Sequence, residues 1–312
     1  MSLSRSLWQF VIAGMVVTLL LSVYADLDDL VAALHAFEWW VLPLILGLTL
    51  GNQLLRFAKW EYLLGEVGVN LERWTSFQVF GSGLVMIMTP GKLGEMWKSW
   101  LIRDIDGTPI SRTMPVIATE RISDLLGVVT ISLLGVIAFD RSPLVLVALT
   151  LPIVGGIVVL QYERACYWIL GLVDRIPVVE RWSDDIRELY QSSQELLHIR
   201  PLGVATVLSV LSWGLECVGF WFVLRGFDAE VSLLVAAFVF ALSSVLGAVS
   251  LLPGGLGVTE GSMTGLLLVF EVAQATAASA TIVIRAATLW FTASLALVVY
   301  LSLRWRSSLD MY

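Results

Sequence analysis

Residues 252–260 read LPGGLGVTE, and residues 89–95 read TPGKLGE. Both stretches place Pro-Gly-x-Leu-Gly, followed by a glutamate, within largely apolar sequence. Proline removes a backbone donor and glycine permits sharp turns, so each stretch should interrupt a helix. Lipid does not satisfy the freed backbone N–H and C=O groups, so each break must be buried in protein or line a wet cavity. The two motifs therefore predict two broken, re-entrant helical hairpins.

The composition places these breaks in a membrane protein. The chain has 312 residues, of which 58% are hydrophobic and 14% are charged, and its mean hydropathy is +0.85. A soluble domain carries about 25% charged residues. The net charge of -7 and the lack of a Lys/Arg-rich run exclude nucleic-acid binding. Cys166 and Cys217 are too few for a disulfide framework or a zinc site, so no metal or cofactor is expected.

Apolar runs that approach the length of one bilayer crossing recur along the chain. They cover residues 7–24, 39–55, 74–88, 114–139, 143–161, 202–224, 231–252, 256–270 and 277–303. We interpret the first run as a retained span, and a removable signal peptide is the alternative. The runs 74–88 and 256–270 are short because each adjoins a break. The sequence predicts an all-α, polytopic membrane protein that forms one transmembrane domain over residues 1–312.

Charged residues between the runs predict the orientation. Residues 25–38 contain acidic residues but no Lys or Arg. Basic residues follow the second run, where Arg56, Lys59 and Arg73 are interpreted as loop residues, and they recur in 162–200 and after the last run. Because short cytoplasmic loops are enriched in Lys and Arg, both termini are predicted on the cytoplasmic side of the cell membrane. Residues 162–200 are predicted to form an amphipathic cytoplasmic linker.

The two motifs also indicate an internal duplication. Pro90 and Pro253 are about 163 residues apart (253 minus 90), and an arginine follows each at a similar distance, Arg121 and Arg285. The repeat halves are predicted at about 39–139 and 202–303. The three runs between the motifs make an odd number of crossings, which inverts the second half. Interrupted helices at corresponding positions of two inverted halves are typical of secondary transporters, with the substrate site at the interface of the halves.

Charged residues inside the apolar runs mark the candidate site. A charge at the bilayer centre costs about 2.5–3.5 kcal/mol on insertion scales, so such residues should face the bundle interior. Glu120, Arg121 and Asp124 share one helix face and form either a structural cluster or part of a ligand site. Arg285 should pair with Glu260, with Glu95 or with a lipid phosphate, which guanidinium binds in a bidentate manner. The predicted lipid-binding residues are Pro90, Gly91, Lys92, Gly94, Glu95, Glu120, Arg121, Asp124, Glu216, Pro253, Gly254, Gly255, Gly257, Glu260 and Arg285.

In this order, the motifs resemble the lysylphosphatidylglycerol synthase transmembrane-region family of flippase-like membrane proteins. The resemblance covers residues 7–303 and rests on the two Pro-Gly motifs, on Glu120-Arg121-x-x-Asp124 and on Arg285. Thr259 stands where the family's second motif often carries arginine. The resemblance implies a membrane domain that translocates or handles lipids. The cytosolic transferase domain that is fused to some relatives is not expected here.

Together, the residues and the resemblance predict a lipid translocator and not an enzyme. It would move an anionic phospholipid or a polyprenyl-phosphate-linked lipid through a central cavity between the two Pro-Gly loops. One alternative is a noncatalytic membrane partner of a separate glycosyltransferase or lipid synthase. The other is a membrane enzyme that acts on a lipid-linked substrate, with Glu95 or Glu260 as general base. The oligomeric state and the coupling ion are left open.

Overall fold

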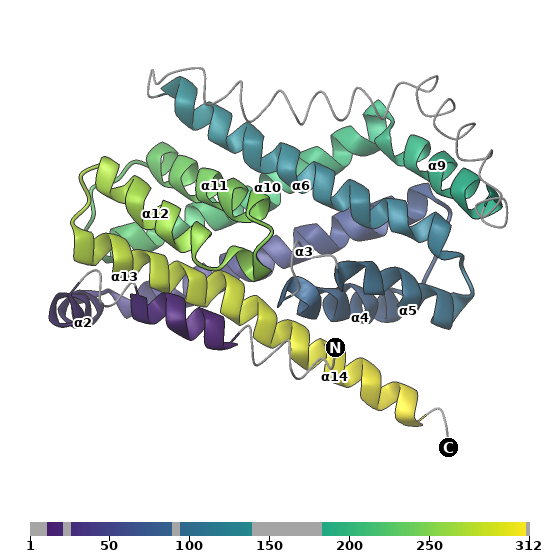
Figure 1. Ribbon diagram of the computed structural model, residues 1–312, viewed down its shortest axis with the longest axis horizontal. Helices are drawn as coiled ribbons and strands as arrows, with labels where there is room; N and C mark the ends of the chain where they lie inside the picture. Colours follow the sequence, from purple (N-terminus) through teal and green to yellow (C-terminus); the bar gives the residue numbers. More distant parts are fainter. Residues whose placement is uncertain (1–10, 21–25, 89–93, 139–182, 310–312) are drawn as a thin grey trace.

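The computed structural model describes residues 11–20, 26–88, 94–138 and 183–309. Within these ranges the chain is built from helices and contains no strand, which confirms the all-α class (Figure 1). A helix at Val11–Leu20 comes first. The following helices are α2 (Leu27–Ala36), α3 (Leu42–Glu66), α4 (Arg73–Leu84), α5 (Trp97–Asp106), α6 (Ile110–Ala138), α9 (Ser183–Leu197), α10 (Ile199–Gly226), α11 (Leu233–Val249), α12 (Val258–Val269), α13 (Gln274–Arg285) and α14 (Phe291–Leu309). Short turns of other helix types are η1 (Trp39–Val41), η2 (Val85–Met88), η5 (Pro253–Gly255) and η6 (Ala286–Trp290).

Three described helical segments are long and apolar enough to cross a membrane, namely Trp39–Glu66, Ile199–Gly226 and Gln274–Leu303. The last of these joins α13 and α14 through a π-helical turn at η6. Each begins at or close to the start of a predicted run. The predicted run at residues 143–161 lies outside the described residues.

The second run is longer than predicted. Helix α3 continues to Glu66, eleven residues beyond the predicted end at Leu55, so Arg56 and Lys59 lie inside the helix. Both side chains are buried, with Arg56 7% and Lys59 0% exposed. The interpretation of these two residues as loop charges was therefore wrong. Residues 56–66 contain good helix formers and no proline, so nothing in them ends the helix before Gly65 and Gly68.

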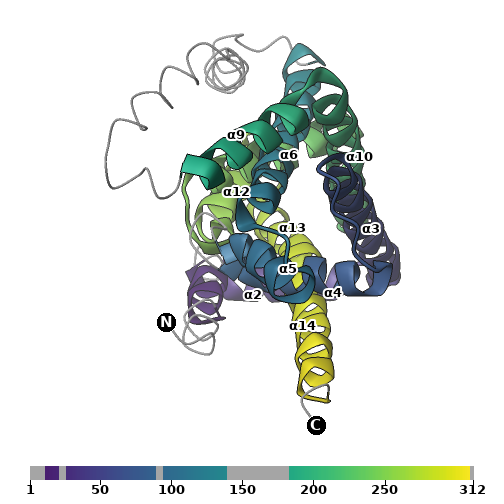
Figure 2. The same cartoon turned by 90° about the vertical axis from the view of Figure 1, so that its right-hand side faces the viewer.

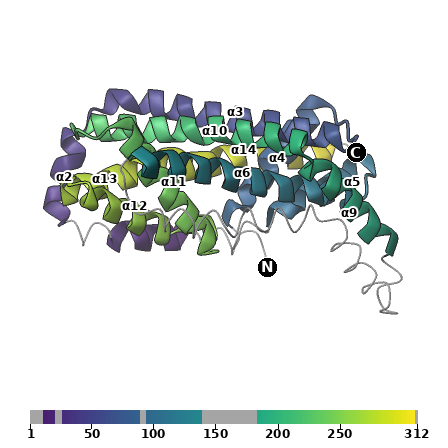
Figure 3. The ribbon, with the colours of Figure 1, turned by 90° about the horizontal axis from the view of Figure 1, so that it is seen from above.

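The two parts of the chain on either side of α9 repeat one order of elements. In each, a long helix (α3 or α10) is followed by two shorter helices around a break (α4 and α5, or α11 and α12) and then by further long helical segments (α6, or α13 through α14). Helices α3 and α10 lie side by side along most of their length (Figure 3). Around them, α4 packs against α14 and α11 packs against α6. This exchange of equivalent contacts is expected of two related halves, whose predicted inverted relation stays a prediction.

Glycine permits both of these equivalent contacts. A Cβ on Gly81 of α4 would lie 2.6 Å from Val299 of α14, and a Cβ on Gly135 of α6 would lie 2.5 Å from Phe238 of α11. Small residues let helix backbones approach closely in membrane proteins. The sequence thus places a glycine at each of the two corresponding helix crossings.

Helix α9 lies in the stretch that was predicted to be a cytoplasmic linker. It packs along α6, as the view along the bundle shows (Figure 2). Leu196 and Leu197 at its end are 0% and 5% exposed, and Ser111 of α6 donates a hydrogen bond to Glu188. The described part of the stretch is therefore a helix attached to the bundle, while its cytoplasmic location stays a prediction.

Candidate functional site

The second Pro-Gly motif forms a break between two packed helices. Helix α11 ends at Val249 and α12 begins at Val258, and the two helices contact each other. Between them, Gly254, Gly255 and Gly257 adopt positive φ values of 59°, 67° and 86°. Such values are unfavourable for residues with a Cβ, so the glycines of the motif permit this path. Helices α4 and α5, which flank the first motif in the sequence, also contact each other, and residues 89–93 of this motif lie outside the described residues.

The two breaks are neighbours in space. The turn η2, which leads into the first motif, contacts η5, which contains Pro253. The charged side chains in the bundle interior form one group beside each break. We call the group next to the first motif the interior ion cluster and the group next to the second motif the Arg285 pair.

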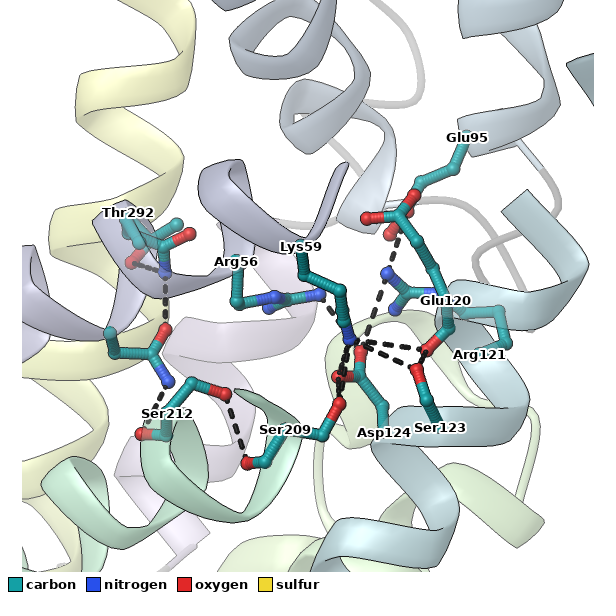
Figure 4. A network of polar contacts seen from close by, with 12 residues as sticks. Arg56, Lys59, Glu95, Glu120, Arg121, Ser123, Asp124, Ser209, Ser212 and Thr292 are labelled. Atoms are coloured by element: carbon teal, nitrogen blue, oxygen red, sulfur yellow. Dashed lines mark hydrogen bonds and ion pairs between the residues drawn. The ribbon is translucent and has the colours of Figure 1, made fainter. Parts of the chain in front are cut away.

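Asp124 on α6 is the centre of the interior ion cluster (Figure 4). Its Oδ1 accepts a hydrogen bond from Lys59 Nζ at 2.6 Å. Its Oδ2 lies 3.2 Å from Arg56 Nη2 and 3.5 Å from Arg121 Nη2. Lys59 Nζ also donates to Ser209 of α10 at 2.8 Å. One carboxylate thus joins cations of α3 and α6 and a hydroxyl of α10.

Lys98 and Glu95 extend the cluster to the first motif. Lys98 Nζ on α5 donates to Glu120 Oε2 at 2.6 Å, lies 3.7 Å from Glu95 Oε2, and stands 4.3 Å from the centre of a Trp60 ring. Arg121 Nη2 lies 3.1 Å from Glu95 Oε2. Glu95, Lys98 and Glu120 are at most 1% exposed. The glutamate of the first motif is therefore an interior residue held by two cations.

Arg121 is the most accessible member of the interior ion cluster. Its side chain is 27% exposed, whereas those of Arg56 and Asp124 are each 8% exposed. The Nε atoms of Arg56 and Arg121 are buried and have no hydrogen-bond partner within the described part of the chain. A guanidinium that retains unused donors can bind a further acceptor, and it suits phosphate oxygens in particular.

A row of uncharged polar groups leads across α3 from this cluster. Asn52 donates to the Ser212 carbonyl of α10 at 2.9 Å. Gln53 donates to Asn52 at 3.1 Å and lies 3.3 Å from the hydroxyl of Thr292 on α14. The Ser212 hydroxyl donates to the backbone carbonyl of Ser209, and the Ser209 hydroxyl donates to Asp124 Oδ1 (Figure 4). Polar contacts thus connect α14 with the interior ion cluster through the centre of the bundle.

The Arg285 pair stabilises the second break. Arg285 Nε donates to Glu260 Oε1 at 2.6 Å, and Nη2 donates to the Gly254 carbonyl at 2.7 Å. Glu260 Oε2 accepts from the backbone N–H of Gly257 at 2.7 Å, just before α12 begins. Arginine and glutamate therefore satisfy backbone groups that the break would leave unpaired. Of the partners left open by the sequence, the structure selects Glu260 for Arg285.

The two groups contain corresponding ion pairs. Arg121 pairs with Glu95 beside the first motif, and Arg285 pairs with Glu260 beside the second. The arginines are about 164 residues apart (285 minus 121) and the glutamates about 165 (260 minus 95). These separations agree with the period of the two Pro-Gly motifs, so the same pair recurs at each break. Among the residues that the structure describes, the groups differ because Arg56, Lys59 and Lys98 belong to the first group, while the second has Arg285 as its cation.

The predicted site residues that the structure describes fall into three sets. Gly94, Glu95, Glu120, Arg121 and Asp124 lie in or next to the interior ion cluster, whereas Pro90, Gly91 and Lys92 lie outside the described residues. Pro253, Gly254, Gly255, Gly257, Glu260 and Arg285 form the second break. Glu216 lies on α10 seven residues beyond Ser209, a rise of about 10 Å along the helix.

The prediction from sequence missed three cations of the interior ion cluster, Arg56, Lys59 and Lys98. A pattern did mark two of them, because Asn52, Arg56 and Lys59 recur at the spacing of one helix face within α3. Lys98 follows Glu95 by three residues, which also places both on one side of a helical turn. These spacings show that the residues share a face but do not show that the face points inward.

Two further features concern ligands. Within the described ranges, no group of three or more His, Cys, Asp or Glu side chains is placed to hold a metal ion. An apolar groove of about 490 Å³ lies between the helix Val11–Leu20 and Trp290, and Gly14, Met15 and Leu19 are among its lining residues. No member of the interior ion cluster lines this groove.

Comparisons with known proteins agree with this architecture. Residues 11–296 match the family described as the lysylphosphatidylglycerol synthase TM region. A UPF0104 membrane protein of Methanothermobacter thermautotrophicus is 25% identical over 319 aligned positions, which cover 94% of this chain and 92% of that protein. A second UPF0104 membrane protein of the same organism is 24% identical and covers 76% of this chain and 78% of its own length. A UPF0104 membrane protein of Methanocaldococcus jannaschii is 22% identical over 58% of this chain and 77% of its own. Because the family match spans most of the sequence, the chain belongs to the lysylphosphatidylglycerol synthase transmembrane-region family of membrane proteins.

Proposed function

We propose that this protein translocates a lipid with an anionic headgroup across the cell membrane. The headgroup would bind at the interior ion cluster, beside the first break, while the hydrocarbon tails stay in the bilayer. The candidate lipids are an anionic phospholipid and a polyprenyl-phosphate-linked lipid. The protein would act as a transporter that leaves the lipid chemically unchanged.

The observation that carries the proposal is the state of Arg121. It lies in an apolar bundle, beside the first break, with 27% of its side chain exposed and a buried Nε that has no hydrogen-bond partner within the described residues. Interior arginines in membrane proteins mark substrate pathways because their burial is costly without a functional partner. Family membership supports a lipid-related role, since the family is described by a lipid synthase.

The packing of the breaks supports a mechanism of alternating access. Helix pairs that contain a break meet at η2 and η5, and each break is tied to an interior arginine through a glutamate. In transporters with repeated halves, one half rocks against the other around a site at their interface. Here an incoming phosphate would compete with Glu95 for Arg121, which would loosen the tie between α6 and the first motif.

Lipid translocation in reconstituted vesicles tests the proposal. The purified protein is placed in vesicles that contain a trace of fluorescent phosphatidylglycerol, and the fraction reached by an external quencher is followed over time. We expect wild-type protein to accelerate translocation and Arg121→Ala to slow it at least tenfold. Arg103→Ala is the matched control, because the Arg103 side chain is 52% exposed and pairs only with the neighbouring Asp104 among the described residues. It should translocate as fast as wild type.

Three outcomes would contradict the proposal. Folded Arg121→Ala and Arg285→Ala variants that translocate lipid at the wild-type rate would refute the site assignment. Chemical conversion of a polyprenyl-linked lipid by the purified protein would favour the enzyme alternative. Transport that appears only when a separate synthase co-purifies would favour the partner alternative.

The predicted orientation is tested separately. Reporter tags at the two termini and within 26–38 should place both termini in the cytoplasm and the tagged segment outside. Termini on opposite faces would contradict the assumption that each broken hairpin enters and leaves on one side of the membrane.

A further inference from the structure

The apolar groove beside the helix Val11–Leu20, which we call the Trp290 groove, adjoins the second break. The helix lies next to the joined helices α13 and α14 (Figure 1). A Cβ on Gly14 would overlap the indole of Trp290, so this glycine lets the ring approach the helix backbone. Val17 and Trp290 both pack against the small apolar cluster that contains Leu256, a residue of the second Pro-Gly motif. The groove therefore lies next to the elements that form this break.

Trp290 lies deep in the membrane-spanning part of the chain. It is sixteen residues from the start (290 minus 274) and thirteen from the end (303 minus 290) of the segment Gln274–Leu303. At about 1.5 Å per residue, it is about 20 Å or more from either end, and the hydrocarbon core of a bilayer is about 30 Å thick. Trp290 also ends the π-helical turn η6, and such turns frequently occur at functional sites. The groove is thus at the depth of lipid chains and not of their headgroups.

The lining of the Trp290 groove excludes polar ligands. The described residues that line it are Val11, Gly14, Met15, Thr18, Leu19 and Trp290. None of these residues is charged, and the Thr18 hydroxyl donates to the Gly14 carbonyl at 2.9 Å within its own helix. A phosphate would lose its hydration here without gaining a partner, and water does not fill a cavity with apolar walls. The volume of about 490 Å³ is within the range of ligand pockets.

Packing, and not hydrophobicity, would hold a lipid chain in this groove. The surrounding lipid is as apolar as the groove, so the hydrophobic effect does not favour either environment. An unfilled groove loses the van der Waals contacts of its walls, because no atoms lie opposite them. A hydrocarbon chain restores these contacts, with the helix Val11–Leu20 on one side and the Trp290 ring on the other. Lipid chains are also the material that surrounds the protein at this depth.

We propose that the Trp290 groove is a binding site for one hydrocarbon chain of a membrane lipid. The chain lies between the helix Val11–Leu20 and the π-helical turn η6, next to the second break, while the headgroup of the same lipid stays near the membrane surface. This site is separate from the proposed headgroup site, because no member of the interior ion cluster lines the groove. The inference does not require that the protein translocates lipid, so the two proposals are tested separately.

Two neighbouring faces of the helix Val11–Leu20 provide matched variants. Met15 and Leu19 are four residues apart and line the groove. Val16 and Leu20 have the same spacing one position later and are not among the lining residues. Leu19 and Leu20 are 62% and 63% exposed, so they differ in the face that they occupy and not in accessibility. Leu19→Trp should therefore place an indole in the groove, and Leu20→Trp should place it outside.

Photo-crosslinking from a lipid chain tests the site. The protein is reconstituted in phosphatidylcholine vesicles with a trace of phosphatidylcholine that carries a diazirine near the end of one acyl chain, and labelled residues are mapped by mass spectrometry. We expect Ala286–Trp290 to be labelled at least fivefold more than the surroundings of Leu54 and Leu211, which are 63% and 53% exposed near the middle of their spans. Leu19→Trp should lower the labelling of Ala286–Trp290 at least fivefold, and Leu20→Trp should leave it unchanged.

Met15→Trp, with Val16→Trp as its control, covers the case in which Leu19→Trp does not fold. Labelling of the groove that does not exceed labelling around Leu54 and Leu211 would overturn the inference, and so would unchanged labelling in a folded groove variant. Labelling that avoids the groove, as expected if residues 1–10 or a second copy of the protein fills it, would overturn it as well. The probe is zwitterionic and its translocation is not measured. Failure to translocate phosphatidylglycerol would therefore refute the proposed function and leave a positive labelling result standing.

Discussion

Replacement of Lys98 by methionine should lower the free energy of unfolding by about 3–5 kcal/mol, the usual cost of removing one partner from a buried ion pair. Lys98 is 1% exposed, and its Nζ lies 2.6 Å from Glu120 Oε2, a carboxylate that is 0% exposed. Methionine keeps much of the chain length but leaves this carboxylate without its cation. The contact of Lys98 Nζ with the Trp60 ring, at 4.3 Å, is also lost, which places the expected loss near the upper end of this range.

The structure also ranks the related variants. Glu120→Gln should cost less than Lys98→Met, because Lys98 would keep Glu95 at 3.7 Å as a partner. Replacement of both residues by apolar ones, Lys98→Met with Glu120→Leu, should recover at least about 2 kcal/mol relative to Lys98→Met alone, since apolar residues often substitute for a buried ion pair without loss. The pair should therefore show a large coupling energy in a double-mutant cycle.

Equilibrium unfolding in mixed micelles, followed by circular dichroism over a range of denaturing detergent, measures these free energies. All four proteins of the cycle are compared under one lipid and detergent composition. Two results would show that the pair does not hold the first break to α6. One is that Lys98→Met lowers the free energy of unfolding by less than about 1 kcal/mol. The other is that the loss in the double variant equals the sum of the losses in the two single variants.

Two further predictions concern packing. Gly247→Ala should destabilise the protein by about 1–3 kcal/mol, because the new Cβ would overlap the hydroxyl of Thr259 next to the second break. Gly265→Ala is the matched variant, since its Cβ would meet open space on α12. It should be neutral or stabilising by up to about 1 kcal/mol in the same unfolding assay. Equal losses for the two alanine variants would contradict this assignment. The Cys217 side chain is 2% exposed in the core. In a Cys166→Ser variant it should therefore react with a membrane-permeant maleimide only after denaturation. Rapid labelling of the native protein would show that α10 does not bury this thiol.

The helical bundle was predictable because its signals are local. Long apolar runs indicate helices in a membrane, and Pro-Gly pairs indicate where a helix stops. The second break follows this expectation closely, with Gly254 and Gly257 in conformations that suit glycine. The interior position of Glu120 and Asp124 was also predictable, since lipid excludes such side chains.

The partners of these charges were only partly predictable. The sequence left Glu260, Glu95 and a lipid phosphate open as partners of Arg285, and only the packing of α13 against α12 selects Glu260. The sequence indicates loop positions for Arg56 and Lys59, because basic side chains near the end of an apolar run commonly extend to the membrane surface. Their inward orientation depends on Asp124, which is more than 60 residues away in the chain.

By itself, the sequence determined that this protein is an all-helical membrane protein with two interrupted segments and charged residues in its interior. It could do so because hydrophobicity, helix breaking and the cost of burying charge depend on each residue and its neighbours along the chain. Only the tertiary structure decided that η2 and η5 touch and that α3 turns its basic face toward α6. It also decided that, among the described residues, one cluster gathers four cations around three carboxylates. An ion pair acts between groups that folding brings together, so its partners depend on helix packing and not on spacing in the sequence.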